Sequence, residues 1–408
     1  MNKLGHFKLS AVAVAVALVS ACGGGGSSSS KSADTSVGVI TGFGSIYVNG
    51  VEYETSKITP VVDGVPRAET TLGVGDVVTI TGTVNADGVT GTATSVRCDD
   101  ELEGYVLAIN LQADGTGTLN VMGQTVTITL DTVFEGDTLA AITDLSVNDI
   151  VEVSGFSSGT GLVTATRIET KSAADDVEVK GLVSELDTGL QTFKLGALTV
   201  DYSAAGEVPQ NLADGLYVEV KTDKALTGDV GSGFTLYASK VEIEDDGDME
   251  LEGDEGEEVK MQGIVSDITA TSFRFNGALV EFSTLETDDE FDLSSLTEGQ
   301  LITVEGYFNK DGQFVVTEIE DEHESEDEAE GTVTAVGDST VTIVSGNNQL
   351  TFTVTTTTRM MDEQQSTNLH YFSLADVSVG DFVKIEFYVD DTSGDNIATE
   401  LERDDLPK

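Results

Sequence analysis

One block of sequence recurs five times along this chain of 408 residues, and the repetition restricts the folds that the chain can adopt. Each copy opens with a glycine before apolar or β-branched residues, and a second glycine then separates two short runs. A turn-like segment such as Val74-Gly75-Asp76 follows, and a β-branched segment closes the copy. The opening glycines are Gly38, Gly104, Gly181, Gly263 and Gly331. Blocks that keep one order in five windows indicate five copies of one structural module.

The recurring blocks have the pattern of β-strands. Segments 125–129 and 301–305 alternate with a period of two and are rich in Val, Ile and Thr, as half-buried strands are. Glycines and Gly-Asp pairs between these runs suit turns. Each copy offers about five strands, with a longer polar connection such as 131–146 between the third and the fourth. The pattern therefore predicts an all-β chain of tandem small five-stranded OB-like barrels, about five repeats in number.

The N-terminus has the organisation of a secretory signal peptide. Lys3 and Lys8 carry positive charge, 9–19 is apolar, and small residues precede Cys22. An apolar run this short does not cross a hydrocarbon core of ~30 Å as a helix, and it fits the central region of a signal peptide. The segment Val19-Ser20-Ala21-Cys22 resembles the lipobox of bacterial lipoproteins. This resemblance implies cleavage before Cys22 and acylation of its thiol.

The lipid expected on Cys22 would hold the mature chain on a membrane. Residues 23–30 are glycines followed by serines, and we expect them to form a flexible tether. Because Gly23 and not Asp follows the cysteine, the resemblance implies the outer membrane, on its periplasmic or its outer face. No later segment is long and apolar enough to span a bilayer. An ordinary signal peptide with an incidental cysteine is the alternative.

Two acidic runs interrupt the repeats, at 244–258 and 318–330. Like charges packed this densely repel one another and favour extended linkers. The predicted organisation is a signal peptide at 1–21, a lipidated Gly/Ser tether at 22–35, β-modules at 36–99, 100–171, 172–243, 259–317 and 329–408, and acidic linkers at 244–258 and 318–328.

The charge of the chain excludes one class of partner. Asp and Glu number 73 against 20 Lys and Arg, and the formal net charge is −53 at pH 7. Such a chain repels phosphate backbones, so we expect no nucleic-acid partner. The acidity favours solubility and attracts divalent cations and basic partners. Adaptation to a salty habitat is an alternative origin of this charge.

The first module resembles a known family. Its segment 41–53, with the sequence TGFGSIYVNGVEY, is similar to the opening of tandem β-domains in an uncharacterised bacterial family, classified as a domain of unknown function. The blocks at 72–76 and 90–93 are similar too. The resemblance extends over nearly the whole chain from Gly38 and is weaker in modules 3 and 5. Such domains often follow a lipobox, and the resemblance implies no activity, cofactor or catalytic residue.

Residues that could carry catalysis are few. Beyond the signal peptide, the histidines are His323 in the second acidic run and His370 in a polar connection, and they lack metal-ligand spacing such as H-E-x-x-H. Asp76, Asp149 and Asp381 occupy the same position in their modules, which indicates a repeated turn-capping role. We therefore predict no catalytic residue, and we expect that the protein is not an enzyme.

Cys98 is the cysteine that remains if Cys22 is acylated. It stands at the end of a strand-like run and precedes Asp99 and Asp100, whose negative charge disfavours a thiolate. We interpret it as a small residue at a strand end. An intermolecular disulfide or a reactive thiol is the alternative.

The first acidic run contains candidate metal ligands, namely Asp248, Glu250, Glu252 and Asp254. The first three are spaced like the early ligands of an EF-hand loop, which binds Ca²⁺ through oxygen atoms. Position twelve of such a loop would be Val259, which provides no bidentate carboxylate, so we reject an EF-hand. Weak binding of Ca²⁺ or Mg²⁺ remains a hypothesis, with His323 as a candidate ligand for a softer metal in the second run. A solvated spacer is the alternative, and we expect no other cofactor.

These observations predict a non-catalytic cell-envelope lipoprotein whose repeated β-modules act as a binding or structural scaffold for an unknown envelope protein or polymer. A surface protein that binds Ca²⁺ through its acidic linkers is one alternative. Carbohydrate binding through Phe43, Tyr47, Phe273 and Phe275 is another, although the chain has no Trp and aromatic residues with a period of two usually pack in a core.

Overall fold

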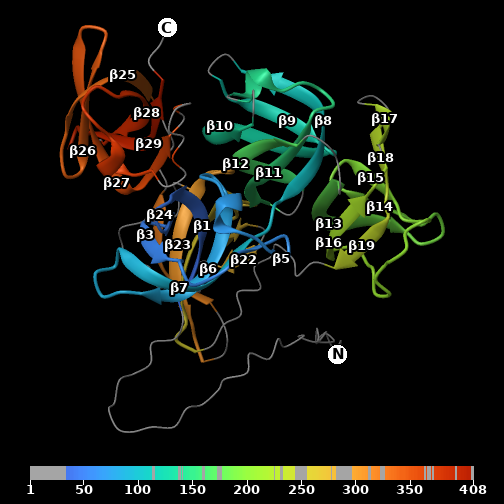
Figure 1. Cartoon of the computed structure of the whole chain (residues 1–408). Coiled ribbons are helices and arrows are strands. Elements are labelled where there is room, and N and C mark those ends of the chain that lie inside the picture. Colours follow the sequence, from blue (N-terminus) through green and yellow to red (C-terminus); the bar gives the residue numbers. More distant parts are fainter. Residues whose placement is uncertain are drawn as a thin grey trace. The chain divides into compact units, whose positions relative to one another are not determined.

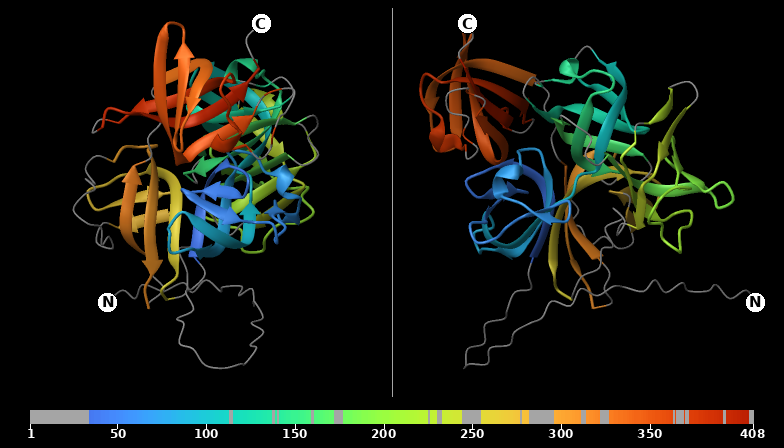
Figure 2. Two further views of the ribbon diagram at one scale, coloured as in Figure 1. Left: turned by 60° about the vertical axis from the view of Figure 1, so that its left-hand side comes forward. Right: turned by 45° about the vertical axis from the view of Figure 1, so that its right-hand side comes forward.

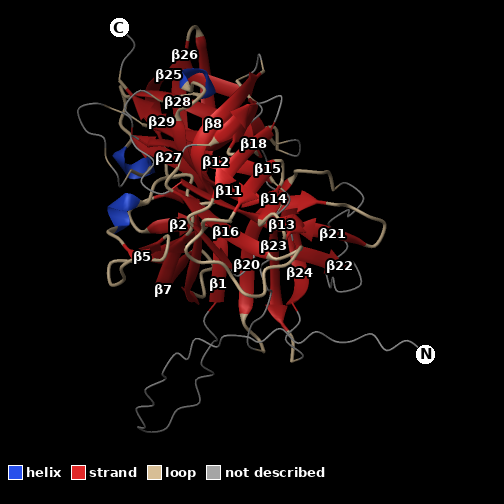
Figure 3. Cartoon of the chain, turned by 90° about the vertical axis from the view of Figure 1, so that its right-hand side faces the viewer, coloured by secondary structure: helices blue, strands red, loops and turns tan. Residues whose placement is uncertain are grey.

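The computed structural model describes most of the chain from Asp34 onwards. The described residues are 34–112, 115–136, 139, 141–158, 161–171, 177–224, 226–229, 233–243, 255–276, 278–281, 296–310, 314–321, 327–362, 364, 369, 372–390 and 393–405. They form β-strands, turns and three short 3-10 helices, with no α-helix among them (Figure 1, Figure 3). No helix in these ranges is long and apolar enough to cross a membrane. The all-β prediction is confirmed.

Module 5 is a closed barrel. Its strands follow the order β25-β26-β27-β29-β28 around the barrel, and β28 pairs back onto β25. All neighbours are antiparallel except β27 and β29, which run parallel. This is the small five-stranded barrel expected from the sequence. The bounds are β25 (Asp327–Val336), β26 (Thr340–Ser345), β27 (Asn348–Asp362), β28 (Phe382–Val389) and β29 (Asn396–Asp404), with the 3-10 helix η5 (Leu374–Asp376) before β28.

Modules 1 and 2 repeat this strand order. In module 2 the third and fifth strands, β10 and β12, are parallel, and β11 pairs back onto β8. In module 1 the corresponding pairs are β3 with β7 and β6 with β1, and a small hairpin, β4–β5, lies between the third and fourth barrel strands. The bounds are β1 (Asp34–Gly42), β2 (Ile46–Val48), β3 (Val51–Glu54), β4 (Val61–Val62), β5 (Val65–Pro66), β6 (Val77–Val84), β7 (Thr90–Cys98), β8 (Leu102–Leu111), β9 (Gly117–Val121), β10 (Gln124–Glu135), β11 (Ile150–Ser157) and β12 (Leu162–Lys171), with η1 (Glu69–Thr71) and η2 (Ile142–Asp144) before the fourth barrel strands.

Modules 3 and 4 vary the same plan. The fifth strand of module 3 is divided, so that β18 runs parallel to β15 while β19 pairs with β16. In module 4, β20 pairs with β21 and β23, and β23 pairs with β24. The bounds are β13 (Val177–Asp187), β14 (Thr192–Leu195), β15 (Leu198–Asp201), β16 (Tyr217–Thr222), β17 (Thr227–Asp229), β18 (Gly233–Tyr237), β19 (Lys240–Ile243), β20 (Glu258–Ser266), β21 (Ser272–Phe275), β22 (Ala278–Glu281), β23 (Leu301–Phe308) and β24 (Phe314–Asp321).

The two glycine blocks of the sequence come into contact in the fold. In module 1, Asn49 and Gly50 have φ values of 50° and 76°, which allow the tight two-residue turn between β2 and β3. The Asn49 amide then donates a hydrogen bond to the carbonyl oxygen of Val37, at 2.9 Å. A Cβ atom on Gly38 would overlap the Asn49 side chain. The opening glycine therefore leaves room for the side chain of the turn.

The third block joins the first strand to the turn before the fourth. The Ile40 N–H donates to the carbonyl oxygen of Asp76 at 2.8 Å, and the Gly75 N–H donates to the carbonyl oxygen of Ile40 at 2.9 Å. The same pair of backbone hydrogen bonds occurs in every module, at Val106, Val183, Val265 and Val333 in modules 2 to 5. These two backbone hydrogen bonds hold the turn against the first strand of the barrel, which explains why the third block recurs in the sequence.

Apolar side chains from both glycine blocks fill the barrels. Modules 1, 4 and 5 each have an apolar cluster, while modules 2 and 3 share one cluster. Phe43, Phe273 and Phe275 are buried in these cores. Phe273 and Phe275 lie two residues apart on β21 and point into the barrel, and Phe43, in the turn between β1 and β2, is buried as well. The sequence-based hypothesis of an aromatic carbohydrate-binding face is wrong for these three residues.

First strands of different modules also pair with each other. β1 runs parallel to β20, with Thr35 opposite Val259 and Val37 opposite Met261, so that modules 1 and 4 share one sheet of 12 strands. β8 pairs antiparallel with β13, which joins modules 2 and 3 in a second sheet of 12 strands. Figure 2 shows the blue strands of module 1 beside the yellow and orange strands of module 4. Modules distant in sequence are therefore joined by backbone pairing.

Three predicted boundaries are shifted. β1 already begins at Asp34, within the predicted tether, and β20 begins at Glu258, within the first predicted linker. The second predicted linker, 318–328, is mostly strand, because β24 continues to Asp321 and β25 begins at Asp327. Acidic residues fit a strand here since they alternate with buried residues: Ile319 is buried and the neighbouring Glu320 is exposed.

Candidate functional site: the junctions between modules

The three equivalent aspartates cap turns, as the sequence predicted. Each carboxylate accepts a hydrogen bond from the backbone N–H three residues earlier. The pairs are Asp76 with Gly73 at 2.8 Å, Asp149 with Ser146 at 2.7 Å, and Asp381 with Ser378 at 2.9 Å. A carboxylate in this position satisfies a donor that the turn leaves free.

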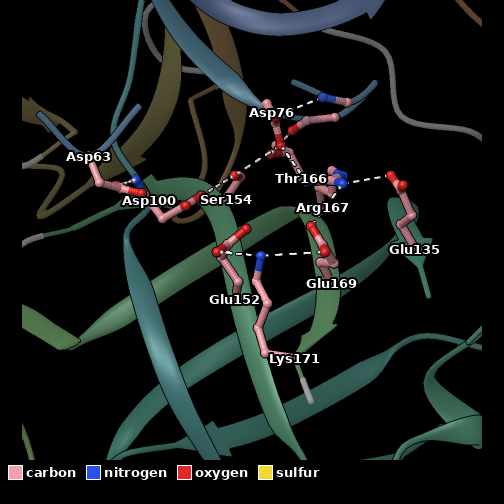
Figure 4. A network of polar contacts seen from close by, with 12 residues as sticks. Asp63, Asp76, Asp100, Glu135, Glu152, Ser154, Thr166, Arg167, Glu169 and Lys171 are labelled. Atoms are coloured by element: carbon pink, nitrogen blue, oxygen red, sulfur yellow. Dashed lines mark hydrogen bonds and ion pairs between the residues drawn. The ribbon is translucent and has the colours of Figure 1, made fainter. Parts of the chain in front are cut away.

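Asp76 additionally joins module 1 to module 2 (Figure 4). Its Oδ1 lies 2.9 Å from Nη1 of Arg167 in β12, and the two side chains are only 4% and 6% exposed. The Nη2 atom of Arg167 contacts Glu135 at 2.6 Å and Glu169 at 3.1 Å. The guanidinium can hold several carboxylates at once because its donors form a fixed fork. Removing either partner by substitution would leave a buried charge without its partner, which is strongly unfavourable.

A serine continues the network towards Asp100. Ser154 Oγ lies 2.7 Å from Asp100 Oδ1 and 3.3 Å from Asp76 Oδ1 (Figure 4). A hydroxyl has one proton to donate, so Ser154 donates mainly to the nearer Asp100 and shares the same proton with the more distant Asp76. Thr166 adds a hydrogen bond of 2.6 Å to the carbonyl oxygen of Gly75.

Burial shifts the titration of groups at this junction. It raises the pKa of Asp100 well above the usual range, and Glu152 and Asp63 add to the shift. Burial also raises the pKa of Asp76, although Arg167 opposes this shift. Burial alone would lower the pKa of Arg167, but the charges of Asp76, Glu135 and Glu169 together outweigh it and the pKa is raised. Burial therefore disfavours the charged form of Asp100, whereas Arg167 beside Asp76 favours the charged form of that carboxyl.

Cys98 lies beside the same network. It is a buried free cysteine, and burial together with Asp76 and Asp100 raises the pKa of its thiol well above the usual value. The prediction that its thiolate is disfavoured is confirmed. A buried neutral thiol is unreactive.

Module 5 contacts module 2 through a second arginine. Arg359 Nη2 lies 3.1 Å from Asp131 of β10, and its Nε lies 3.1 Å from Glu400 of its own module. Burial alone would lower the pKa of Arg359, but Asp131, Glu400 and Glu386 together outweigh it and the pKa is raised. Nearby, burial and the charge of Glu400 raise the pKa of Glu386 to about 8.

Sequence reasoning missed Arg167 and Arg359. Both lie in strands of a chain with only 20 basic residues against 73 acidic ones. In the closing segment, the position of Arg167 corresponds to Ser95 in module 1, Lys240 in module 3 and Glu400 in module 5, and Ser95 is exposed. The repeat gives no signal for these arginines, because a basic residue also stands at this position in module 3 and only the burial of Arg167 and Arg359 requires carboxylate partners.

The predicted lipidation and metal sites lie outside the described residues. These are Cys22 for lipidation, Asp248, Glu250, Glu252 and Asp254 for a metal ion, and the histidines His323 and His370. Within the part of the chain that the structure describes, no group of three or more His, Cys, Asp or Glu side chains is arranged to hold a metal ion.

The strand order and the repeated turns define a tandem array of small OB-like β-barrels. The chain belongs to the family described as Domain of unknown function (DUF5666), whose model matches residues 37–97, 103–169, 180–242, 262–320 and 330–402. These five matches coincide with the five modules. The resemblance inferred from the sequence is confirmed.

Comparisons with curated proteins and with solved structures give no information about the function of the chain. No curated protein matches the chain significantly. A solved structure, the crystal structure of a multidomain protein with nucleic acid binding domains from Streptococcus pneumoniae, is similar at 9% identity with a TM-score of 0.15, over 55% of this chain and 72% of that one. A likeness this weak carries no argument about either fold or ligand.

Proposed function

We propose that this protein is a non-catalytic lipoprotein of the cell envelope, held at the outer membrane by lipid on Cys22. Its five modules serve as a scaffold that binds an envelope protein or polymer. The observation that carries the proposal is the pairing of first strands between modules, above all β1 with β20. Pairing of this kind suits a scaffold, because it fixes one module against another that is distant in sequence.

The use of the carboxylates supports a non-catalytic role. Asp76, Asp149 and Asp381 cap turns, and Asp76 also neutralises a buried arginine. These contacts give all three carboxylates a structural role at the same position of the repeat.

The anchor is tested by replacing the acylated cysteine. Full-length protein is expressed in a Gram-negative host with a labelled fatty acid, and the envelope is fractionated. The wild-type protein should carry the label and sediment with the outer membrane, whereas Cys22→Ala should lose both properties. Cys98→Ala is the matched control, since that thiol is buried. Label that persists in Cys22→Ala would refute the anchor.

The scaffold role is tested by cross-linking in intact cells. A photoreactive residue at an exposed position such as Leu190 or Val379 should give a reproducible product with one envelope protein or polymer. A photoreactive residue at the buried Phe352 serves as the control and should give none. The absence of any product from the exposed positions on all five modules would count against a binding scaffold.

A further inference from the structure

A cavity of about 510 Å³ lies where modules 1, 2, 4 and 5 meet. Each of these modules contributes to its wall, for example Thr41 in module 1, Thr164 in module 2, Gln262 in module 4 and Thr357 in module 5. Binding sites for small molecules usually have volumes of roughly 300–1,000 Å³. The cavity has the size of a site for a small ligand, and no single barrel could form it.

Hydroxyl and amide groups dominate the polar part of this wall. Thr129 and Thr164 come from the parallel strands β10 and β12 of module 2, and neither hydroxyl has a hydrogen-bond partner among the described residues. The Gln262 oxygen accepts the Val39 N–H at 3.1 Å, while its NH₂ group has no partner in the same described ranges. A hydroxyl both donates and accepts, and an amide NH₂ donates. The wall therefore offers complementary partners to a ligand rich in hydroxyl groups.

The remaining wall is apolar or has paired charges. Val39 and Phe156 belong to a small apolar cluster between modules, and both line the cavity. Among the charged groups of the wall, Arg359 is paired with Asp131 at 3.1 Å and Glu320 with Lys260 at 3.1 Å. An anionic ligand would meet no unpaired cation among these described groups and would be repelled by a chain of net charge −53.

We propose that this cavity binds a small, neutral, hydroxyl-rich ligand, namely one or two sugar units of an envelope polysaccharide. The hydroxyls of Thr129 and Thr164 and the amide of Gln262 bond the sugar hydroxyls, and Val39 and Phe156 pack against its C–H groups. The inference rests on the proposed scaffold, because the wall comes from four modules that must remain joined. It names the chemical class of the polymer that the scaffold binds.

Titration calorimetry of the mature chain against glucose, galactose, N-acetylglucosamine and maltose tests the proposal. At least one sugar should bind saturably. The double variant Thr129→Val, Thr164→Val keeps the side-chain shape but removes two hydroxyls, and it should bind that sugar roughly tenfold more weakly or worse. Thr92→Val is the matched control, because Thr92 is an exposed strand threonine outside the cavity wall. Its affinity should equal that of the wild type.

Three results would overturn the inference. They are the absence of saturable binding for all four sugars at millimolar concentrations, equal affinity in the double variant and the wild type, and tighter binding of glucose 6-phosphate than of glucose. Disulfide closure between Thr35→Cys and Val259→Cys, which are opposite each other in β1 and β20, reports separately on the joining of modules 1 and 4. Closure without sugar binding would refute the cavity ligand alone, whereas failure to close would refute the scaffold.

Discussion

The opening glycine has different neighbours in different modules. In module 5, a Cβ on Gly331 would overlap the backbone carbonyl of Val344, which cannot rotate away. In module 3, a Cβ on Gly181 would lie 3.7 Å from the Leu195 side chain, which is ordinary contact. The opening glycine is therefore required by steric overlap in module 5, whereas the space around it in module 3 would accept a Cβ atom.

Gly331→Ala should destabilise module 5 by about 1–3 kcal/mol, because overpacking forces the backbone of β25 away from β26. Gly181→Ala should be neutral or slightly stabilising, since alanine restricts the unfolded chain more than glycine does. Hydrogen exchange followed by mass spectrometry measures each module separately in the full chain. Similar loss of protection in both variants would contradict the steric argument.

Asp76 and Asp149 occupy the same turn position, but only Asp76 is buried against an arginine. Substituting each of them therefore distinguishes the contribution of the turn cap to stability from that of the ion pair. Asp76→Asn keeps an oxygen acceptor for the Gly73 N–H but removes the charge that faces Arg167. We expect a loss of about 3 kcal/mol at the junction of modules 1 and 2, because a buried cation loses its partner.

Asp149→Asn is the control for this prediction, since Asp149 caps its turn without facing a buried arginine. Its cost should be below about 1 kcal/mol. Hydrogen exchange in β6 and β12 measures both variants. An equal loss of stability in the two variants would show that the ion pair between Asp76 and Arg167 does not stabilise the junction.

At the scale of the strands, glutamates form a row across the sheet of modules 2 and 3. Glu169 is opposite Glu152, Glu152 opposite Glu103, and Glu103 opposite Glu178. The row ends where Glu178 is opposite Lys221. Like charges directly opposite one another destabilise a sheet. Burial, with the charge of Glu152, accordingly raises the pKa of Glu103 to about 7.

This row predicts a stability that falls with rising pH. Because the folded-state pKa of Glu103 is raised to about 7, its stabilising contribution is complete below the unfolded-state pKa of about 4.3 and is lost as the pH rises through 7. Glu103→Gln should therefore stabilise β8 at pH 8 by roughly 1–2 kcal/mol, and should change little at pH 4.

Hydrogen exchange at the two pH values, corrected for the intrinsic rate, measures the effect. Asp338→Asn is the control, because Asp338 is an exposed turn residue of module 5 and its substitution should not alter β8. A gain in Glu103→Gln that is equal at both pH values would contradict the assigned titration.

The strands could be predicted from the sequence because the alternation of apolar and polar residues within each strand indicates which of its faces is buried. The alternation in 125–129 and 301–305 indicated strands, and the recurrence of Asp76, Asp149 and Asp381 indicated the turn caps. It missed the division of the fifth strand of module 3 into β18 and β19. It also placed the end of module 4 too early, since a dense run of acids has the composition of a linker although β24 continues to Asp321 and Ile319 is buried in it.

The arrangement of modules lay beyond the sequence. Strand-to-strand pairing across modules uses backbone groups, which every residue carries, so Thr35 and Val259 show no sign that they are neighbours. The same holds for the cavity, whose threonines are ordinary within their own strands and gain a role only where four modules meet. The sequence repeat therefore predicts the fold of each barrel, whereas contacts between barrels determine how the modules are arranged and where the cavity forms.

The parallel register of β1 and β20 makes a specific prediction for the whole molecule. Adjacent strands are about 4.7–4.9 Å apart, and a disulfide needs Cα atoms roughly 4.4–6.8 Å apart. Thr35→Cys combined with Val259→Cys places two cysteines directly opposite each other. Mild oxidation of the full chain should close a bridge within one molecule, visible as faster migration on a non-reducing gel.

The off-register pair Thr35→Cys with Met261→Cys is the matched control. Its cysteines are on the same face but two residues apart along the strand, a separation of about 7–8 Å that a disulfide does not bridge without backbone movement. Bridging of the first pair and not of the second would establish both the contact and its register. If the modules instead moved independently on their linkers, both pairs would close to the same extent, because a flexible chain brings either pair together by collision.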